Sequence, residues 1–287
     1  METYTIKKSD SFELEDIFEC GQCFRWNKME DGSYIGVIKE GVVKVEEQDD
    51  NITFTGKLLD GYDFKKVIRT YFDLDTDYEI YKEKLKKIDT YMKESIEYGS
   101  GIRILNQDLW ECIISFIISA NNNIPRIKKI IENLSRTYGK KIVFEGRDYY
   151  TFPDEVALSK ASIEDLRNMG LGFRDVRVYN TTKMIIENNV NLESIKKLDS
   201  TEDMRNILLS LDGVGPKVAD CILLFSLKRW DVFPIDVWVR RVMNDLYIKK
   251  DDEKKVNKKE ILELATKKYG DISGLAQQYL FYWKRGK

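Results

Sequence analysis

The spacing of apolar residues changes once along the chain, and this change constrains the fold more than any other feature of the sequence. In the first sixty residues, alternating or β-branched segments begin at Tyr34, Gly41 and Asn51, with turn residues between them. Such segments predict the strands of a small antiparallel sheet. From Tyr62 to Phe72 the apolar residues recur at helical spacing instead.

After about residue 103 strand signals nearly vanish, and short turns separate segments with a helical pattern. We therefore expect an α+β fold, with an N-terminal antiparallel-sheet domain over 1–102 and an all-helical region over 103–287. The expected helices run from Leu109 to Ala120, Pro125 to Tyr138, Ile163 to Met169, Val176 to Asn188, Glu202 to Leu211, Pro216 to Leu227, Asp236 to Leu246, Lys258 to Tyr269 and Ile272 to Trp283.

The composition is that of an ordinary globular protein, with 43% hydrophobic and 33% charged residues among 287. No apolar run is long enough to span a bilayer, and the first thirty residues lack the apolar stretch of a signal peptide. We expect a soluble cytoplasmic protein, associated with the nucleoid in a prokaryote or nuclear in a eukaryote. Nothing in the sequence indicates more than a monomer.

The chain has no histidine and only four cysteines, which excludes several classes of active site. Ser-His-Asp triads, histidine-bearing zinc sites and imidazole acid–base catalysis are all ruled out. Cys20-x-x-Cys23 could form half a zinc site or a redox pair, but no second pair completes four ligands. Packing thiols are the better interpretation.

The net charge of −2 hides an asymmetry along the chain. Residues 30–63 contain nine acids and three bases, whereas residues 121–148 contain seven bases and three acids. A local basic segment can contact phosphates while the rest of the protein stays acidic. A solvated helix face has the same composition, so the pattern permits nucleic-acid binding without requiring it.

The segment from Leu211 to Cys221 carries the most informative motif. A helix ends near Leu209, Gly213 and Gly215 form a tight hairpin, and Pro216 opens the next helix. We expect a helix-hairpin-helix over 202–227. The amides of the two glycines and of the first helical turn, including Val218, would then point together and form a phosphate site.

Lys217 lies in the first turn of the second helix, where the helix dipole disfavours its charged form. Nineteen residues later Asp236 stands at an expected helix N-cap, where the dipole favours an ionised carboxylate. An amine shifted toward its neutral form and a carboxylate shifted toward its ionised form suit nucleophilic attack on a sugar with cationic character. The alternative interpretations are a solvated surface lysine and a simple capping aspartate.

Four motifs together identify a family resemblance. The hairpin motif with Pro234-x-Asp236 is accompanied by Gly21-Gln-Cys-Phe-Arg-Trp26, by Ser119-Ala-Asn-Asn-Asn-Ile-Pro-Arg126 and by Gly170-Leu-Gly-Phe-Arg174. In this order and spacing they resemble the 8-oxoguanine DNA glycosylases of the eukaryotic type, which are helix-hairpin-helix enzymes. The resemblance extends from about residue 10 to residue 285.

The resemblance implies a bifunctional glycosylase and lyase acting on duplex DNA, with Lys217 as nucleophile and Asp236 as its charged partner. It implies a pocket for the flipped base formed by Gly21, Phe116, Cys221, Pro234, Gln277 and Phe281. It also implies that the space left by the base, and the orphaned cytosine, are contacted by Asn121, Arg126, Phe173 and Arg174.

The resemblance implies no required cofactor, although the carbonyls of Leu209, Leu211 and Val214 could hold a sodium or potassium ion. A C-terminal four-cysteine cluster is absent from the sequence, which argues against the iron–sulfur branches of the superfamily. Trp238 stands where relatives often carry a histidine, so a phosphate contact there is in doubt.

Two alternatives remain open from the sequence. One is a glycosylase of the same fold with another lesion, such as an alkylated purine. The other is a non-catalytic DNA-binding module, in which the hairpin binds phosphates and Lys217 is only another cation.

Overall fold

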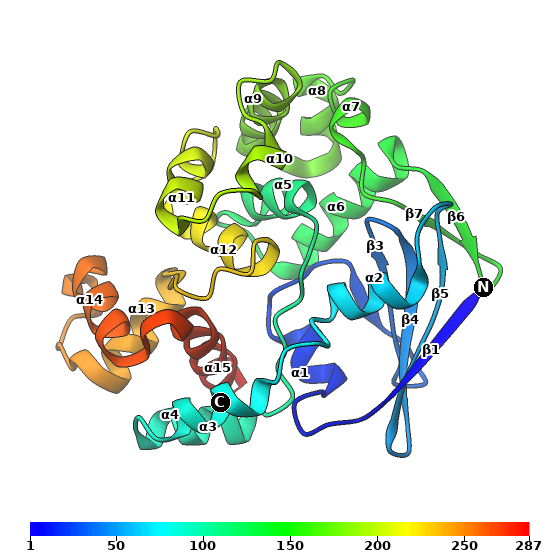
Figure 1. Cartoon of the computed structure of the whole chain (residues 1–287). Helices are drawn as coiled ribbons and strands as arrows, with labels where there is room; N and C mark the ends of the chain where they lie inside the picture. Colours follow the sequence, from blue (N-terminus) through cyan, green and yellow to red (C-terminus); the bar gives the residue numbers. More distant parts are fainter. Residues whose placement is uncertain (287) are drawn as a thin grey trace.

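A computed structural model describes residues 1–286, with a β-sheet at one end and a larger group of helices at the other (Figure 1). The sheet has five antiparallel strands in the order β1-β5-β4-β3-β2. The three strands expected at 34, 41 and 51 are confirmed. The strands are β1 (Glu2–Lys7), β2 (Trp26–Lys28), β3 (Tyr34–Ile38), β4 (Gly41–Gln48) and β5 (Asn51–Leu58).

All nine helices expected after residue 103 are present, although two of them end early in π-helical turns, at Arg167–Leu171 and Asn244–Ile248. Within residues 1–286 none of the helices combines the length and apolarity needed to cross a membrane. The helices are α1 (Leu14–Glu19), α2 (Phe64–Tyr71), α3 (Tyr78–Lys86), α4 (Thr90–Tyr98), α5 (Leu109–Ser119), α6 (Ile124–Tyr138), α7 (Glu155–Leu158), α8 (Ile163–Leu166), α9 (Asp175–Ile186), α10 (Leu192–Ile195), α11 (Thr201–Leu209), α12 (Pro216–Ser226), α13 (Val237–Met243), α14 (Lys258–Tyr269) and α15 (Ser273–Gly286).

The expectation of an all-helical region after residue 103 is wrong at one place. A hairpin of β6 (Lys141–Phe144) and β7 (Arg147–Tyr150) lies between α6 and α7, beside the sheet (Figure 1). Its alternating side chains Ile142 and Phe144 are buried against apolar residues of β3 and β4. The turn between the strands has positive φ at both residues, 48° and 73°, which suits a two-residue hairpin.

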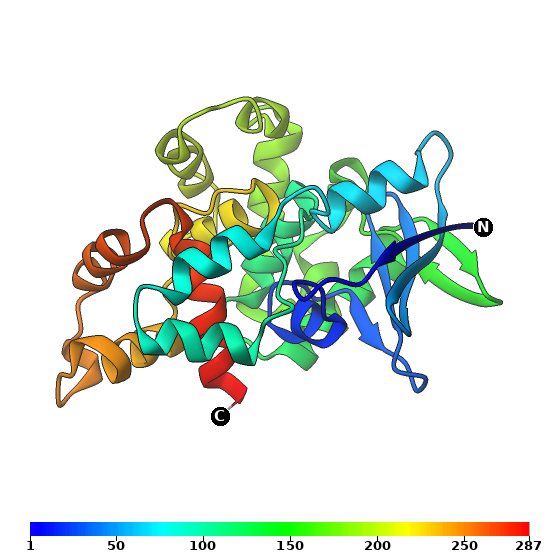
Figure 2. The same cartoon turned by 60° about the horizontal axis from the view of Figure 1, so that its bottom comes forward.

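The segment before residue 103 also contributes to the helical core. Helices α3 and α4 lie beside α15 in both orientations of the molecule (Figures 1 and 2). Their buried residues Tyr78, Leu85, Met92 and Ile96 belong to the same apolar cluster as α5, α12 and α15. Residues on both sides of the predicted boundary at 102–103 therefore share one core, and the boundary stays a prediction.

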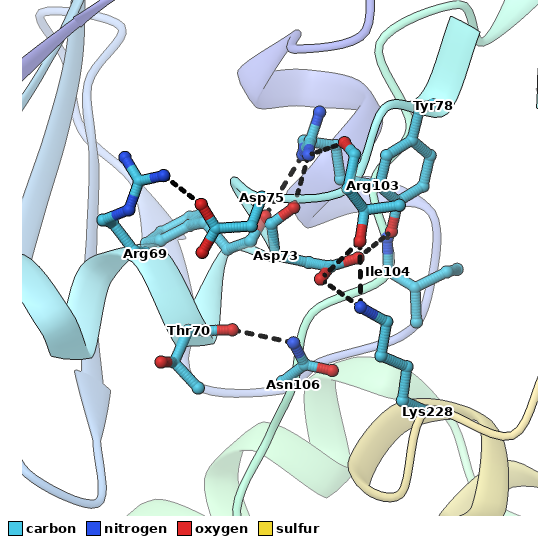
Figure 3. Close-up of polar contacts among 11 residues, drawn as sticks. Arg69, Thr70, Asp73, Asp75, Tyr78, Arg103, Ile104, Asn106 and Lys228 are labelled. Atoms are coloured by element: carbon cyan, nitrogen blue, oxygen red, sulfur yellow. Dashed lines mark hydrogen bonds and ion pairs between the residues drawn. The ribbon is translucent and has the colours of Figure 1, made fainter. Parts of the chain in front are cut away.

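A buried polar junction joins the end of α2 to the linker before α5 and to the loop after α12 (Figure 3). Arg103, only 5% exposed, donates to the carbonyls of Phe72 at 3.1 Å, of Ser11 at 3.2 Å and of Thr76 at 3.0 Å, and also to that of Asp73. The Asp73 carboxylate accepts hydrogen bonds from Lys228 at 2.7 Å and from the Tyr78 hydroxyl at 3.0 Å.

Replacing Arg103 with methionine should destabilise the protein by about 3 kcal/mol, because several buried carbonyls lose their donor at once. The midpoint of urea unfolding measures this change. Arg69→Met is the matched control, since the Arg69–Asp75 ion pair in the same region is exposed and should contribute less than about 1 kcal/mol. Equal midpoints for the two variants would contradict the structural role of Arg103.

Candidate active site

The helix-hairpin-helix is formed by α11, the turn at residues 210–215, and α12. Gly213 has φ of +83°, and the Val214 amide donates to the Leu211 carbonyl at 3.1 Å. Asp212 is held from α9, since the Thr181 hydroxyl donates to its carbonyl at 2.8 Å. The turn is thus fixed against its neighbours rather than free to adapt.

The N-terminus of α12 is open to an anion. Its N-cap is Gly215, which has no side chain to accept from the first-turn amides, and a β-carbon there would meet nothing within 4 Å. The amides of the first turn, including that of Val218, therefore have no side-chain cap. A helix N-terminus without a side-chain cap, behind a glycine turn, is a suitable phosphate site.

Lys217 points from the first turn of α12 into a pocket. Its Nζ lies 5.2 Å from the centroid of the Phe116 ring. It also hydrogen-bonds to Cys221, one turn further along the same helix. Burial raises the pKa of the Cys221 thiol, while the neighbouring Lys217 acts in the opposite direction. The thiol thus stays protonated at neutral pH and is a packing group beside the amine.

Asp236 caps α13, as expected, and its carboxylate accepts from the Val239 amide at 2.7 Å. It lines the same pocket as Lys217. Two residues nineteen positions apart, each at the start of a helix, thus line one pocket. A partly buried amine and a carboxylate held by a backbone amide can act together on one substrate atom.

The structure brings every expected base-pocket residue into this one cavity. The lining contains Gly21, Phe116, Cys221, Pro234, Gln277 and Phe281, and also three residues that sequence reasoning missed, Phe225, Val239 and Gln278. Gln278 donates to the Cys20 carbonyl at 2.6 Å and so attaches the Gly21 loop to α15. The sequence signal that could have identified Gln278 is its position directly after Gln277 in the same helix.

The backbone conformation and the surroundings of Gly21 both favour glycine at this position. Its φ is +85°, a conformation that side-chain-bearing residues rarely adopt. A β-carbon there would lie 3.3 Å from the Phe281 ring and 3.3 Å from the Arg285 guanidinium. The loop therefore brings the Gly21 backbone close against the pocket.

The four residues expected beside the orphaned base form a second cluster. Phe173 is 55% exposed. The guanidinium carbon of Arg174 lies 4.2 Å from the centroid of the Phe173 ring. Arg174 itself is buried and donates to the carbonyls of Ala120 and Asn121. Arg126 donates to the Gly170 carbonyl at 3.0 Å and remains exposed. The cluster thus presents one exposed aromatic ring and one exposed cation.

Metal-binding and cysteine chemistry are not indicated at this site. In the part of the chain that the structure describes, no three His, Cys, Asp or Glu side chains are placed to hold a metal ion. All four cysteines are buried and unpaired, as expected for packing thiols. Trp238, two residues after Asp236, is 38% exposed.

Comparison with known proteins covers almost the whole chain. Residues 4–113 match the 8-oxoguanine DNA glycosylase N-terminal domain, and residues 114–267 match the HhH-GPD superfamily of base excision DNA repair proteins. A probable N-glycosylase/DNA lyase of Methanothermobacter thermautotrophicus is 33% identical, over 76% of this chain and 73% of that protein. The N-glycosylase/DNA lyase of Saccharomyces cerevisiae is 32% identical, over 88% of this chain and 72% of that protein.

A solved structure agrees with this assignment. The Clostridium acetobutylicum 8-oxoguanine glycosylase/lyase, in complex with double-stranded DNA containing cytosine opposite 8-oxoguanine, is 42% identical with a TM-score of 0.90. The similarity covers 99% of this chain and 98% of that chain. The protein therefore belongs to the 8-oxoguanine DNA glycosylase family, within the HhH-GPD superfamily of base excision repair proteins.

Proposed function

We propose that the protein is a bifunctional DNA glycosylase and lyase that removes 8-oxoguanine from duplex DNA, preferentially opposite cytosine, in base excision repair. One observation carries this proposal: Lys217 and Asp236 line the same pocket as Gly21 and Gln277. A nucleophile, its charged partner and the residues expected to contact the base are thereby combined. Family membership supports the same conclusion.

The reaction begins with attack of the neutral Lys217 amine on C1′ of the damaged nucleotide. The C1′–N9 bond breaks, and its electron pair leaves with the base. The Asp236 carboxylate stabilises the positive charge that develops on the sugar. The sugar ring then opens: the C1′–O4′ bond breaks, O4′ takes up a proton given up by the amine, and a protonated Schiff base joins Lys217 to C1′. Loss of a proton from C2′ breaks the C3′–O bond and expels the 3′ phosphate by β-elimination.

Recognition requires the nucleotide to be flipped out of the duplex, because C1′ and the base edge are inaccessible within the stack. N7 carries a hydrogen in 8-oxoguanine and is an acceptor in guanine, so the Gly21 carbonyl attracts the lesion and repels the normal base. An unpaired group there costs roughly 1–3 kcal/mol, about a ten- to hundredfold preference. Gln277 contacts the Watson–Crick edge. The base lies between Cys221 and Phe281, and Phe116 and Pro234 complete the wall.

The duplex is held at two further places. The amides of Gly213, Gly215 and Val218 bind a backbone phosphate at the start of α12. The vacated space and the orphaned cytosine are contacted by Asn121, Arg126, Phe173 and Arg174. Arg174 donates four hydrogen bonds to the carbonyls of Ala120, Asn121 and Leu171, so one of its five N–H donors, on Nη1, is left for cytosine.

The hairpin carbonyls suit a monovalent cation. Among residues 1–286 no backbone amide donates to the Leu209 carbonyl outside the helix, while the Leu211 carbonyl accepts only from Val214. Neutral carbonyl oxygens that have no amide partner, or that keep a second lone pair, suit sodium or potassium at a helix end. We infer that Leu209, Leu211 and Val214 would hold such an ion and so stiffen the phosphate-binding turn.

Incubating the wild-type protein with borohydride and a panel of duplexes tests the proposed function. We expect a covalent protein–DNA band and strand cleavage with 8-oxoguanine opposite cytosine, and less of both opposite adenine. An alkylated purine should give neither product. Excision restricted to alkylated purines would favour the alternative lesion, and tight binding without any band would overturn the lyase mechanism.

A further inference from the structure

The last turn of α15 carries two adjacent cations with different surroundings. Lys284 forms an ion pair with Asp245 of the π-helical turn after α13, at 2.5 Å. Arg285 lies instead beside Phe281, a residue of the pocket lining, and its guanidinium carbon is 6.0 Å from the centroid of the Phe281 ring. Within residues 1–286, Arg285 has no carboxylate within ion-pair distance and no hydrogen bond. Among these residues the guanidinium contacts the Phe281 ring rather than an anionic partner.

The Arg285 guanidinium lies against the Gly21 loop. One of its terminal nitrogens is 3.3 Å from the point where a β-carbon on Gly21 would be. The Phe281 ring is 3.3 Å from the same point. Arg285 is exposed, so its guanidinium is not enclosed by packing on every side. An exposed cation thus lies beside Gly21, the residue whose carbonyl is proposed to bind N7.

The chemistry of the lesion makes this position informative. In 8-oxoguanine the added oxygen O8 is bonded to C8, which is next to N7 on the same edge of the base. A donor next to the Gly21 carbonyl that binds N7 is therefore also within reach of O8. A guanidinium carries only donors, and O8 is an acceptor, whereas guanine has a C8–H there and offers no acceptor.

We propose that Arg285 donates a hydrogen bond to O8 of the flipped base and is a second lesion-specific contact beside Gly21. This inference rests on the proposed function. The contact strengthens during the reaction, because the electron pair left on N9 is conjugated with the C8 carbonyl and places negative charge on O8. A positive donor aimed at developing charge lowers the barrier to base release.

The test compares Arg285→Met and Arg285→Lys with Lys284→Met in single-turnover assays. Arg285→Met keeps an apolar stem against Phe281 but has no donor, so excision of 8-oxoguanine should slow about 10- to 100-fold, the range for one charged hydrogen bond. Arg285→Lys keeps a donor and should retain a substantially higher rate than Arg285→Met. Lys284→Met should match the wild type.

Cleavage at a preformed abasic site opposite cytosine separates a contact with O8 from a contact with the DNA backbone. No base is present there, so all three variants should cleave within about twofold of the wild type. Equal losses on abasic and 8-oxoguanine duplexes would indicate a phosphate contact and overturn the proposal. A wild-type rate of 8-oxoguanine excision in Arg285→Met would also overturn the proposal. Equal loss of excision in Arg285→Met and Arg285→Lys would overturn it too, because it would indicate that the side chain acts by packing alone. A wild-type protein that fails on 8-oxoguanine would instead refute the proposed function, and this contact with it.

Discussion

Lys217→Gln is expected to abolish both base excision and the borohydride-trapped adduct while leaving the fold intact. Glutamine has a similar length but no nucleophilic amine, so the single-turnover rate should fall by at least about 10⁴-fold, as when other enzymes lose their nucleophile. The thermal midpoint should change little, because Lys217 is only partly buried and the helix start depends on Gly215 and Pro216.

Binding measurements decide between the catalytic and the non-catalytic interpretation. If Lys217 is the nucleophile, Lys217→Gln should bind an 8-oxoguanine duplex with an affinity within a few-fold of the wild type. Lys259→Gln, which loses an exposed lysine on α14, is a control for the loss of one positive charge. If Lys217 only contacts phosphate, the variant should instead bind more weakly, with the salt-dependence slope reduced by about one.

Asp236→Asn should slow excision by about 10²- to 10³-fold, the range found when one preorganised electrostatic group is removed from an active site. The reason is the loss of a negative charge beside the cationic sugar. Asparagine caps a helix about as well as aspartate, so the bond to the Val239 amide should survive and stability should change little. Single-turnover kinetics and a thermal melt of the same preparation measure the two effects.

Asp154→Asn is the matched control for this substitution. Asp154 caps α7 with the same geometry, accepting from the Ala157 amide at 2.7 Å, but it lies outside the pocket. Both variants should melt alike, and only Asp236→Asn should lose activity. A parallel loss of activity and melting temperature in Asp236→Asn would mean that the carboxylate acts mainly as a cap.

Local sequence signals predicted much of the fold and the site. The Gly213-Val-Gly-Pro216 segment predicts the hairpin because glycine and proline restrict where a turn and a helix can begin. The N-cap role of Asp236 follows from its position before an apolar helical segment. The hairpin of β6 and β7 was missed, although Ile142-Val-Phe144 is a run of residues that favour strands and Gly146 marks the turn. Its four-residue strands were too short to outweigh the surrounding helical pattern.

Contacts between distant parts of the chain could not be predicted in this way. The junction of Asp73 with Lys228 spans 155 positions, and neither residue belongs to a recognisable motif. Arg285 looks like an ordinary basic residue at the end of a helix, where the dipole favours cations. Only the folded chain places it beside Gly21. Residues that depend on such long-range packing leave no periodic or local signal.

The bond between Gln278 and the Cys20 carbonyl also has a consequence for synthesis on the ribosome. These residues are 258 positions apart, so at about 5–20 residues per second the loop waits roughly 13–50 s for its partner helix to be translated. The apolar cluster around the sheet can close earlier, since its members lie between residues 12 and 105. A nascent chain therefore carries a folded sheet long before it can engage damaged DNA. Until then Cys20 and Phe24, which pack with the later helices, remain uncovered and need protection from aggregation.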